Sequence, residues 1–297
     1  MEQTKAIVCN ALTKNYGKNN GLFDCNLQVN EGEVFGLIGP NGAGKSTLIK
    51  LLMDLVKPTS GSAKIFGKDA QKDSIEIKSL VGYLPGELMQ FPGVTVKYIL
   101  NLLMNLRGIA DKSEILRIST RLNLDISRKF SDLSHGNKQK VGLVQAFMHK
   151  PRILILDEPT LGLDPLIQRE LQQMMKEYTA KGNTVVLSSH VLSEVESMCH
   201  RIGLIHRGEI RKLGTLEELR SSRIHKINLI LSGDLPTRAD IEAHRGEQVA
   251  IDGKNISFQI RGSFDPVLKL LSKYQVLEFD SRELSLEEVF FSEVSPA

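Results

Sequence analysis

The segment GPNGAGKST, residues Gly39 to Thr47, restricts the fold more than any other stretch of the sequence. It follows an apolar run, EVFGLI, and leads into KSTLIKLLMDL, whose apolar spacing predicts a helix. The pattern G-x-x-x-x-G-K-S/T between a strand and a helix is typical of a loop that wraps phosphate groups. Its glycines let backbone N–H groups converge on phosphate oxygens, and the positive end of the helix adds attraction. The segment therefore predicts a nucleotide-binding α/β domain.

We expect the whole loop to hold the nucleotide, through Gly39, Pro40, Asn41, Gly42, Ala43, Gly44, Lys45, Ser46 and Thr47. Lys45 is expected to reach the β- and γ-phosphates. The hydroxyl of Ser46 is a candidate ligand for Mg²⁺, and Thr47 a further phosphate contact. A glycine-rich turn that only begins a helix is the alternative, and it would not require the lysine.

Two other apolar runs end in residues suited to nucleotide chemistry. ILILDEP ends in Asp157 and Glu158, followed by a proline. Asp157 is a candidate carboxylate for Mg²⁺, and Glu158 is a candidate general base that polarises water. TVVLSSH ends in His190, a candidate γ-phosphate contact. Taken alone, these could be a solvated acidic turn and a surface histidine, but ligands bind at the carboxyl ends of strands in open α/β sheets.

Apolar runs and helical patterns alternate along much of the chain, which predicts a parallel sheet. Residues 92–130 show helical patterns only, and they indicate a helical subdomain inserted at about 88–150. After GTLEELRSSR the pattern changes: KINLILS, QVAIDG and NISFQI predict strands, and DPVLKLLSKY and SLEEVFFSEV predict helices. We therefore predict one domain over residues 1–220 and a small α+β domain over 221–297.

Composition narrows the classes of function. The 38 basic and 35 acidic residues give a net charge of +3, which argues against a dedicated nucleic-acid surface. No segment approaches the roughly 18 apolar residues of a membrane-spanning helix. The three cysteines are far apart and suggest neither a disulfide framework nor a metal site. We expect a soluble, cytoplasmic protein whose membrane role, if it has one, comes through a partner.

The order of these motifs resembles the nucleotide-binding subunit of ATP-binding-cassette (ABC) transporters. The resemblance covers about residues 6–220 and includes GPNGAGKST (Walker A), ILILDEP (Walker B), LGLDP (D-loop) and SSH (switch histidine). LSHGN lies between the Walker motifs, where the family carries a signature that usually reads Leu-Ser-Gly-Gly-Gln. The implied fold is a P-loop NTPase of the ABC type, with a RecA-like core, an antiparallel β subdomain and an inserted helical subdomain.

The resemblance implies a head-to-tail dimer in which ATP lies between the Walker A motif of one subunit and the signature of the other. Ser134, Gly136 and Asn137 would contact the partner's nucleotide, and Asp164 would couple the two sites. Tyr16 matches the aromatic residue that stacks on adenine in the family. Ser134 also precedes a helical pattern, so it is a natural N-cap.

Within one subunit, the resemblance makes Glu158 the general base, Asp157 the magnesium carboxylate and His190 the γ-phosphate sensor. The sequence departs from the family where a glutamine ligand for Mg²⁺ and the attacking water is usual. Gly86 occupies that position in LVGYLPGELMQF, with Glu87 next and Gln90 a little further on. Glu87 is a candidate replacement, because a carboxylate suits Mg²⁺, but it could equally be a solvated loop acid. The string YLPGE, residues 83–87, resembles strings in bacterial drug and antibiotic exporters. The segments RGEIRKLGTLEELR and SLEEVFFSEV resemble the ends of ATPase subunits in bacterial exporters.

The resemblance therefore implies an ATPase that drives an export system, is bound to separate transmembrane permease subunits at the cytoplasmic face, and uses ATP and Mg²⁺. The C-terminal segment would be an accessory domain that supports dimerisation or regulation. Two alternatives stay open: an ABC-type ATPase that acts on ribosomes or DNA, and a nucleotide-binding switch with little hydrolysis. The dimer would be a homodimer or a pair with a sister subunit.

Overall fold

A computed structural model describes residues 4–18, 20–220, 224–284 and 288. The chain divides into two compact units, residues 1–215 and 216–297. The boundary expected from the sequence, between residues 220 and 221, lies five residues further along the chain. Because the two units are not placed relative to each other, each is described by itself.

The centre of the first unit is a six-stranded sheet with the order β10-β9-β3-β8-β7-β6. Its strands are β3 (Val34–Ile38), β6 (Val81–Leu84), β7 (Ile153–Asp157), β8 (Thr184–Ser189), β9 (Arg201–His206) and β10 (Glu209–Thr215). All neighbours are parallel except β9 and β10, which pair antiparallel. The central strands β3, β7 and β8 are buried at every position, which explains why they read as continuous apolar runs.

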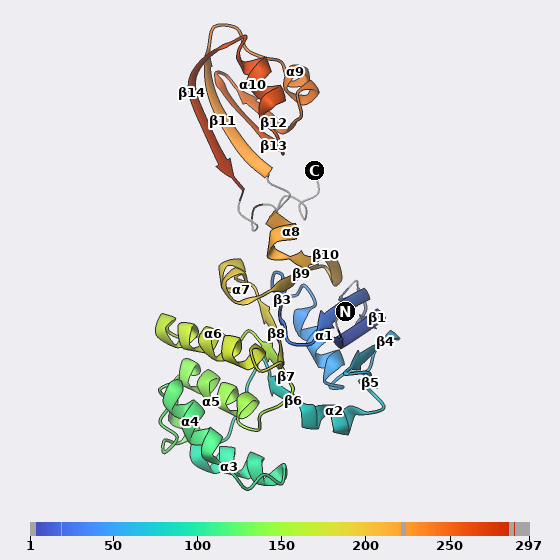
Figure 1. The fold of residues 1–297 in the computed structure, drawn as a ribbon, viewed down its shortest axis with the longest axis vertical. Coiled ribbons are helices and arrows are strands. Elements are labelled where there is room, and N and C mark those ends of the chain that lie inside the picture. Colours follow the sequence, from blue (N-terminus) through green and yellow to red (C-terminus); the bar gives the residue numbers. More distant parts are fainter. Residues whose placement is uncertain (1–3, 19, 221–223, 285–287, 289–297) are drawn as a thin grey trace. The chain divides into compact units, whose positions relative to one another are not determined.

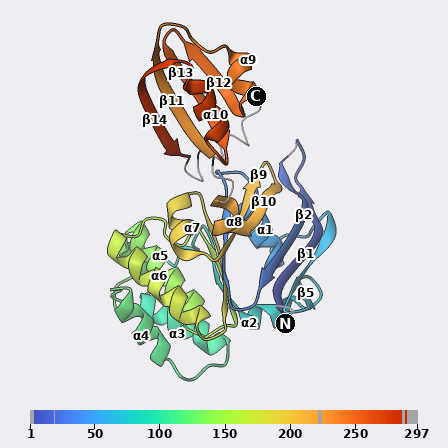
Figure 2. The same cartoon turned by 45° about the horizontal axis from the view of Figure 1, so that its top comes forward.

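A second, antiparallel sheet has the order β2-β1-β4-β5. Its strands are β1 (Lys5–Asn15), β2 (Gly21–Asn30), β4 (Ser60–Ile65) and β5 (Lys68–Asp69). Helix α1 (Lys45–Leu52) contributes Leu48, Ile49 and Leu51 to the hydrophobic core beside this sheet, and α2 (Ser74–Leu80) contributes Ile77. In Figures 1 and 2 this sheet and the helical block lie on opposite sides of the six-stranded sheet.

The helical block consists of α3 (Val96–Leu106), α4 (Ser113–Arg121), a short 3₁₀ turn at Phe130–Asp132 and α5 (His135–Phe147). It matches the helical insertion predicted at about residues 88–150. Helix α6 (Pro165–Thr179) lies beside it (Figure 1), and α7 (Leu192–Met198) packs against β3 and β8. No helix within the described ranges is long and apolar enough to span a membrane.

The second unit is a four-stranded antiparallel sheet with the order β12-β13-β11-β14. Its elements are α8 (Leu216–Arg220), β11 (Ile224–Ser232), α9 (Arg238–Ala243), β12 (Gly246–Asp252), β13 (Asn255–Arg261), α10 (Asp265–Leu271) and β14 (Gln275–Glu283). Helices α9 and α10 cover one face, over a core that includes Leu229, Phe258 and Leu270. The strands expected at KINLILS, QVAIDG and NISFQI are present, and so is the helix expected at DPVLKLLSKY. The helix expected over SLEEVFFSEV lies, apart from Glu288, outside the described residues.

Candidate functional site

The phosphate loop connects the end of β3 to the first residue of α1, as the sequence predicts. Gly44 precedes the helix with φ +113°, a conformation that favours glycine because it crowds a Cβ atom. At Gly39 an added Cβ would lie 2.2 Å from the carbonyl oxygen of Ile205 on β9. The glycines therefore set the path of the backbone in this loop.

Lys45 folds back over this loop. Its side chain is almost buried, with 5% of the residue's surface exposed, and its ammonium donates to the carbonyl oxygens of Gly39 at 2.6 Å and Pro40 at 3.3 Å. The same ammonium lies 3.3 Å from Oε1 of Glu158. A charged group in such a position requires several polar partners, and these three hold the lysine at the loop.

Asp157 and Glu158 follow each other at the carboxyl end of β7, and Ser188 on the neighbouring β8 holds both. Ser188 Oγ donates to Asp157 Oδ1 at 2.5 Å and accepts from the backbone N–H of Glu158 at 3.0 Å. Glu158 has φ +51°, a conformation uncommon for a residue with a side chain. Gln139 on α5 donates to the Glu158 carbonyl at 2.9 Å, so the turn is held from two sides. Such strain is most often found at functional sites.

His190 follows β8, and its Nδ1 lies 2.9 Å from Glu158 Oε2. The carboxylate of Glu158 therefore lies between Lys45 and His190, with one oxygen near each. The sheet order explains this convergence, because β8 lies between β3, which leads into the loop, and β7, which ends at Glu158. The structure thus brings together three residues that the sequence singled out separately.

The loop after β6 passes close to Asp157. A Cβ atom added to Gly86 would lie 3.1 Å from Asp157 Oδ2, so Gly86 lies where a side chain would meet the expected magnesium carboxylate. Glu87 is exposed, and within the described residues its carboxylate makes no hydrogen bond or ion pair. Gln90 Oε1 accepts from Lys138 Nζ at 3.2 Å instead. The structure therefore does not bring Glu87 or Gln90 into contact with Asp157.

Asp157 itself is buried and also affects Tyr83 on β6. Burial and the negative charge of Asp157 raise the pKa of the Tyr83 hydroxyl to about 12. Among the described residues, no group of three or more His, Cys, Asp or Glu side chains could hold a metal ion alone. The candidate ligands are therefore Asp157 and Ser46. These two oxygen donors fit Mg²⁺, which takes one or two carboxylates from the protein and completes its shell with water and substrate phosphates.

The signature segment begins α5. Ser134 is the N-cap of this helix, as predicted, and its hydroxyl accepts from the Asn137 backbone N–H at 3.4 Å. A Cβ atom added to Gly136 would lie 2.3 Å from the carbonyl oxygen of Gly162, so this position admits only glycine without displacement. The signature and the LGLDP segment thus pack directly against each other within one chain.

Asp164 caps α6. Its Oδ1 accepts from the backbone N–H groups of Leu166 and Ile167 at 3.1 and 3.0 Å, and Lys140 Nζ lies 4.0 Å from its Oδ2. Within the part of the chain that the structure describes, no hydrogen bond joins Ser134, Asn137 or Asp164 to the phosphate loop. One subunit therefore does not bring the signature to its own phosphate loop.

Tyr16 lies just after β1 with its ring half-exposed and Lys14 Nζ 5.3 Å from the ring centre. Beside the phosphate loop is an open cavity of about 800 Å³, whose wall includes Gly42, Phe23 and Arg207 but not Tyr16. The N–H of Gly208 donates to the carbonyl of Ala43 at 2.8 Å, which ties this wall to the loop. Sequence reasoning named Gly42 and Ala43 but missed Phe23, Arg207 and Gly208, and also the roles of Ser188 and Gln139, because these act through packing across the fold.

Known proteins are similar to this chain in sequence and fold. A family model described as ABC transporter matches residues 22–161. The bacitracin transport ATP-binding protein BcrA of Enterococcus faecalis is 36% identical over 220 residues, which cover 73% of this chain and 70% of BcrA. The probable multidrug ABC transporter ATP-binding protein YbhF of Escherichia coli (strain K12) is 38% identical over 215 residues, 71% of this chain. That match covers only 37% of YbhF, so this chain corresponds to little more than a third of that relative.

Solved structures of ABC transporter cassettes have the same fold as this chain. The structure of an ATP-binding subunit of an ABC transporter aligns with a TM-score of 0.66 and 33% identity, over 72% of this chain and 92% of that one. The dimeric structure of MJ0796, a bacterial ABC transporter cassette, aligns with a TM-score of 0.64 and 25% identity, over 71% and 98%. These matches confirm the predicted fold class, a P-loop ATPase domain of the ABC type. The chain therefore belongs to the family of ABC transporter ATP-binding proteins.

Proposed function

We propose that this chain is the ATP-hydrolysing subunit of an ABC export system. The observation that carries the proposal is the position of the Glu158 carboxylate, 3.3 Å from Lys45 Nζ and 2.9 Å from His190 Nδ1. A phosphate-binding lysine, a carboxylate base and a histidine within hydrogen-bonding distance of that base are the groups that hydrolysis of a γ-phosphate requires. The presence together of Lys45, Asp157, Glu158 and His190 argues against a switch without hydrolysis, because such a switch would not need all four.

In the proposed reaction, water attacks the γ-phosphorus, the bond to the β-phosphate oxygen breaks, and ADP and phosphate leave. Glu158 accepts the proton of the water, and His190 orients the Glu158 carboxylate and contacts the γ-phosphate. Lys45 turns from Glu158 to the phosphates and stabilises their charge. Asp157 and Ser46 would hold Mg²⁺, which neutralises charge on the phosphates when it is bound. Tyr16 is proposed to stack on the adenine.

We also propose the head-to-tail dimer. Ser134, Gly136 and Asn137 form the N-terminal turn of α5, and the positive end of a helix attracts phosphate. Because this turn makes no hydrogen bond to its own phosphate loop within the described residues, we propose that its ligand is the nucleotide of a second ATPase subunit. Asp164, next to the signature through the Gly136–Gly162 contact, is then placed to connect the two sites.

The export role and the membrane partner rest on the relatives and on one exposed surface. BcrA is named for bacitracin transport and YbhF as a probable multidrug transporter. On α3, Tyr98, Leu102 and Leu106 recur every four residues and are all exposed, so they form an apolar stripe on one face of the helix. Together with the loop over residues 88–96, we propose this stripe as the contact with a transmembrane permease subunit at the cytoplasmic face. The domain over residues 1–220 would supply the ATPase and residues 221–297 an accessory domain.

The first experiment compares ATP turnover by the wild-type protein, Glu158→Gln and a control, Glu76→Gln, whose carboxylate lies on α2. We expect Glu158→Gln to lose at least about 100-fold in turnover, as for removal of a general base, and the control to keep wild-type turnover. With Mg-ATP, light scattering of Glu158→Gln should show a doubled mass. Equal turnover of wild type and Glu158→Gln would favour the nucleotide switch, and a Glu158→Gln variant that stays monomeric would contradict the dimer.

The second experiment tests the stripe. A Leu102→Glu/Leu106→Glu variant should keep its ATP binding but lose its association with membranes from cells that contain the permease. Ile75→Glu is the matched control, because Ile75 is 89% exposed on α2, outside the stripe. Equal membrane association of the three proteins would contradict the proposed contact.

A further inference from the structure

A cavity of about 540 Å³ lies between α4, the end of α5 and α6. Lys150 in its wall precedes β7, and Lys181 and Asn183 precede β8. The cavity is therefore at the amino ends of these strands, whereas the ATP motifs follow their carboxyl ends. None of the motifs of the ATP site contributes a residue to it, so this is a separate site. Its volume is within the range of small-molecule sites.

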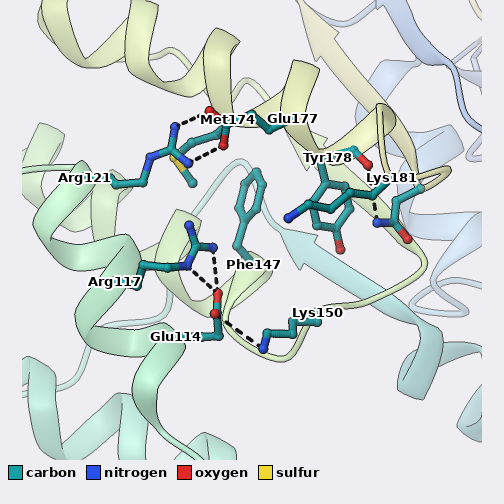
Figure 3. Close-up of a pocket in the computed structure, with 10 residues that line it drawn as sticks. Glu114, Arg117, Arg121, Phe147, Lys150, Met174, Glu177, Tyr178 and Lys181 are labelled. Atoms are coloured by element: carbon teal, nitrogen blue, oxygen red, sulfur yellow. Dashed lines mark hydrogen bonds and ion pairs between the residues drawn. The ribbon is translucent and has the colours of Figure 1, made fainter.

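The wall carries more cations than carboxylates: Arg117, Arg121, Lys150 and Lys181 stand against Glu114 and Glu177 (Figure 3). Glu114 Oε2 lies 2.6 Å from Arg117 Nη2, and its Oε1 lies 3.4 Å from Lys150 Nζ, so one carboxylate is shared by two cations. Lys181 makes no ion pair of 4.0 Å or less within the described residues, and Figure 3 shows its side chain directed towards the cavity.

The acidic groups nearby are already engaged. Glu177 pairs with Arg121 through both oxygens, at 2.6 and 3.1 Å, and Glu170 pairs with the same guanidinium at 2.5 Å. Asp111 is within electrostatic range of Lys150, but it is not part of the wall and accepts hydrogen bonds from Ser113. Lys181 is within electrostatic range of Glu177. The wall as a whole has four cations against two carboxylates, an excess of two.

The remaining wall is apolar. Phe147 and Met174 line it, and the ring of Tyr178 meets that of Phe147 edge to face, with the centres 5.5 Å apart. The Tyr178 hydroxyl donates to the carbonyl of Pro151, and burial raises its pKa, so the ring stays neutral. Aromatic rings that meet in this way provide a surface on which a flat or apolar group gains contact area.

We propose that this cavity binds a small phosphate monoester with an aromatic or apolar body. A phosphate monoester carries close to two negative charges at pH 7, which matches the excess of two cations over carboxylates in the wall. Arginine and lysine donate several hydrogen bonds to phosphate oxygens, and the organic part packs on Phe147 and Met174. Because the cavity lies between α4 and α6, the ligand would join the helical block to the helix that follows the Walker B motif.

Phenyl phosphate is the probe. Titration calorimetry of the full chain is carried out with saturating Mg-ADP, so that the phosphate loop is not available to the probe. We expect binding at one site per chain, at least fivefold weaker binding of phenyl sulfate, which carries one negative charge, and no measurable binding of phenol. Because this site uses none of the ATP-site residues, its failure would leave the proposed ATPase function untouched.

The variant Lys150→Gln/Lys181→Gln should bind phenyl phosphate at least tenfold more weakly than the wild type. Lys150 is 66% exposed at its side chain, and Lys181 is exposed, so the fold should tolerate both changes, which a thermal melt verifies. Lys176→Gln, an exposed lysine of α6 outside the cavity, is the control and should bind as the wild type does. No binding by the wild type, equal affinity in the double variant, or equal affinity for phenyl sulfate would each overturn the proposal.

Discussion

The ammonium of Lys45 lies 3.3 Å from a carboxylate oxygen of Glu158, so the phosphate-loop lysine is paired with the residue that we propose as the base. Both side chains are largely buried, which makes the pair stronger than one at the surface. A γ-phosphate that enters the loop must compete with Glu158 for this ammonium. We therefore expect the pair to link nucleotide binding to the release of the proposed base.

This competition predicts a gain in affinity. Glu158→Gln removes the negative charge opposite Lys45, so we expect ATP to bind about tenfold more tightly, a difference of about 1.4 kcal/mol. The measurement is a titration with ATP in EDTA, which prevents hydrolysis. Glu158→Asp keeps the charge and is the control, with affinity near that of the wild type. Unchanged affinity of Glu158→Gln would show that the ion pair does not compete with phosphate.

The contact between Gly136 and Gly162 predicts a steric effect on the signature. In Gly136→Ala the new Cβ would lie 2.3 Å from the Gly162 carbonyl oxygen, so the LGLDP segment must shift. We expect a loss of stability of about 1–3 kcal/mol, as in overpacked cores, together with a fall in ATP turnover. Denaturant unfolding and an ATPase assay measure the two effects. The control is His135→Ala, which adds no atom and should leave stability near the wild-type value. If Gly136→Ala is as stable as the wild type, the Gly162 carbonyl can move away from the new Cβ atom without cost.

The loop after β6 predicts how Mg²⁺ is held. If Glu87 replaces the family's glutamine when Mg-ATP is bound, Glu87→Ala should raise the Mg²⁺ concentration for half-maximal turnover several-fold, because a carboxylate is a good ligand for this ion. Gln90→Ala should not, because Gln90 contacts Lys138. The measurement is ATP turnover across a range of Mg²⁺ concentrations at fixed ATP. The same Mg²⁺ dependence in Glu87→Ala and wild type would show that Glu87 is a solvated side chain and not a ligand for Mg²⁺.

His149 predicts a pH dependence of stability. Burial, with the charge of Arg107, lowers its pKa from 6.5 to about 4, and its Nε2 lies 3.1 Å from the carbonyl oxygen of Val81. In the unfolded chain the imidazole takes up a proton near pH 6.5, whereas in the fold it does so only near pH 4. The contribution of neutral His149 to the free energy of unfolding is therefore fully present above pH 6.5 and is lost as the pH falls towards 4.

We expect the free energy of unfolding of the wild type to fall by about 2 kcal/mol more than that of His149→Gln between pH 7 and 4.5. Urea unfolding at each pH measures both proteins. The other titrating groups are common to the two proteins, so the difference between the two pH profiles reports His149 alone. Parallel pH profiles would show that the pKa of His149 is the same in the folded and the unfolded chain.

Much of this protein could be predicted from local patterns. The phosphate loop, the strand before it and the helix after it depend on neighbouring residues, and so does the N-cap at Ser134. The apolar runs of β3, β7 and β8 were recognisable because strands buried on both faces contain little else. β14 and α9 were not foreseen, since every residue of β14 is exposed and its sequence lacks a buried face.

The sequence by itself determined the fold class, the family and the residues of the nucleotide motifs, because each depends on residue types at short, regular spacings. Only the tertiary structure decided that Glu158 lies between Lys45 and His190, since the sheet order β3-β8-β7 brings together three strand ends that are far apart in the chain. It also decided that Gly136 meets Gly162, and that Arg117 and Lys150 both pair with Glu114 in the wall of a cavity that Phe147 also lines. Such contacts depend on how distant segments pack, and packing leaves no pattern at any fixed spacing along the sequence.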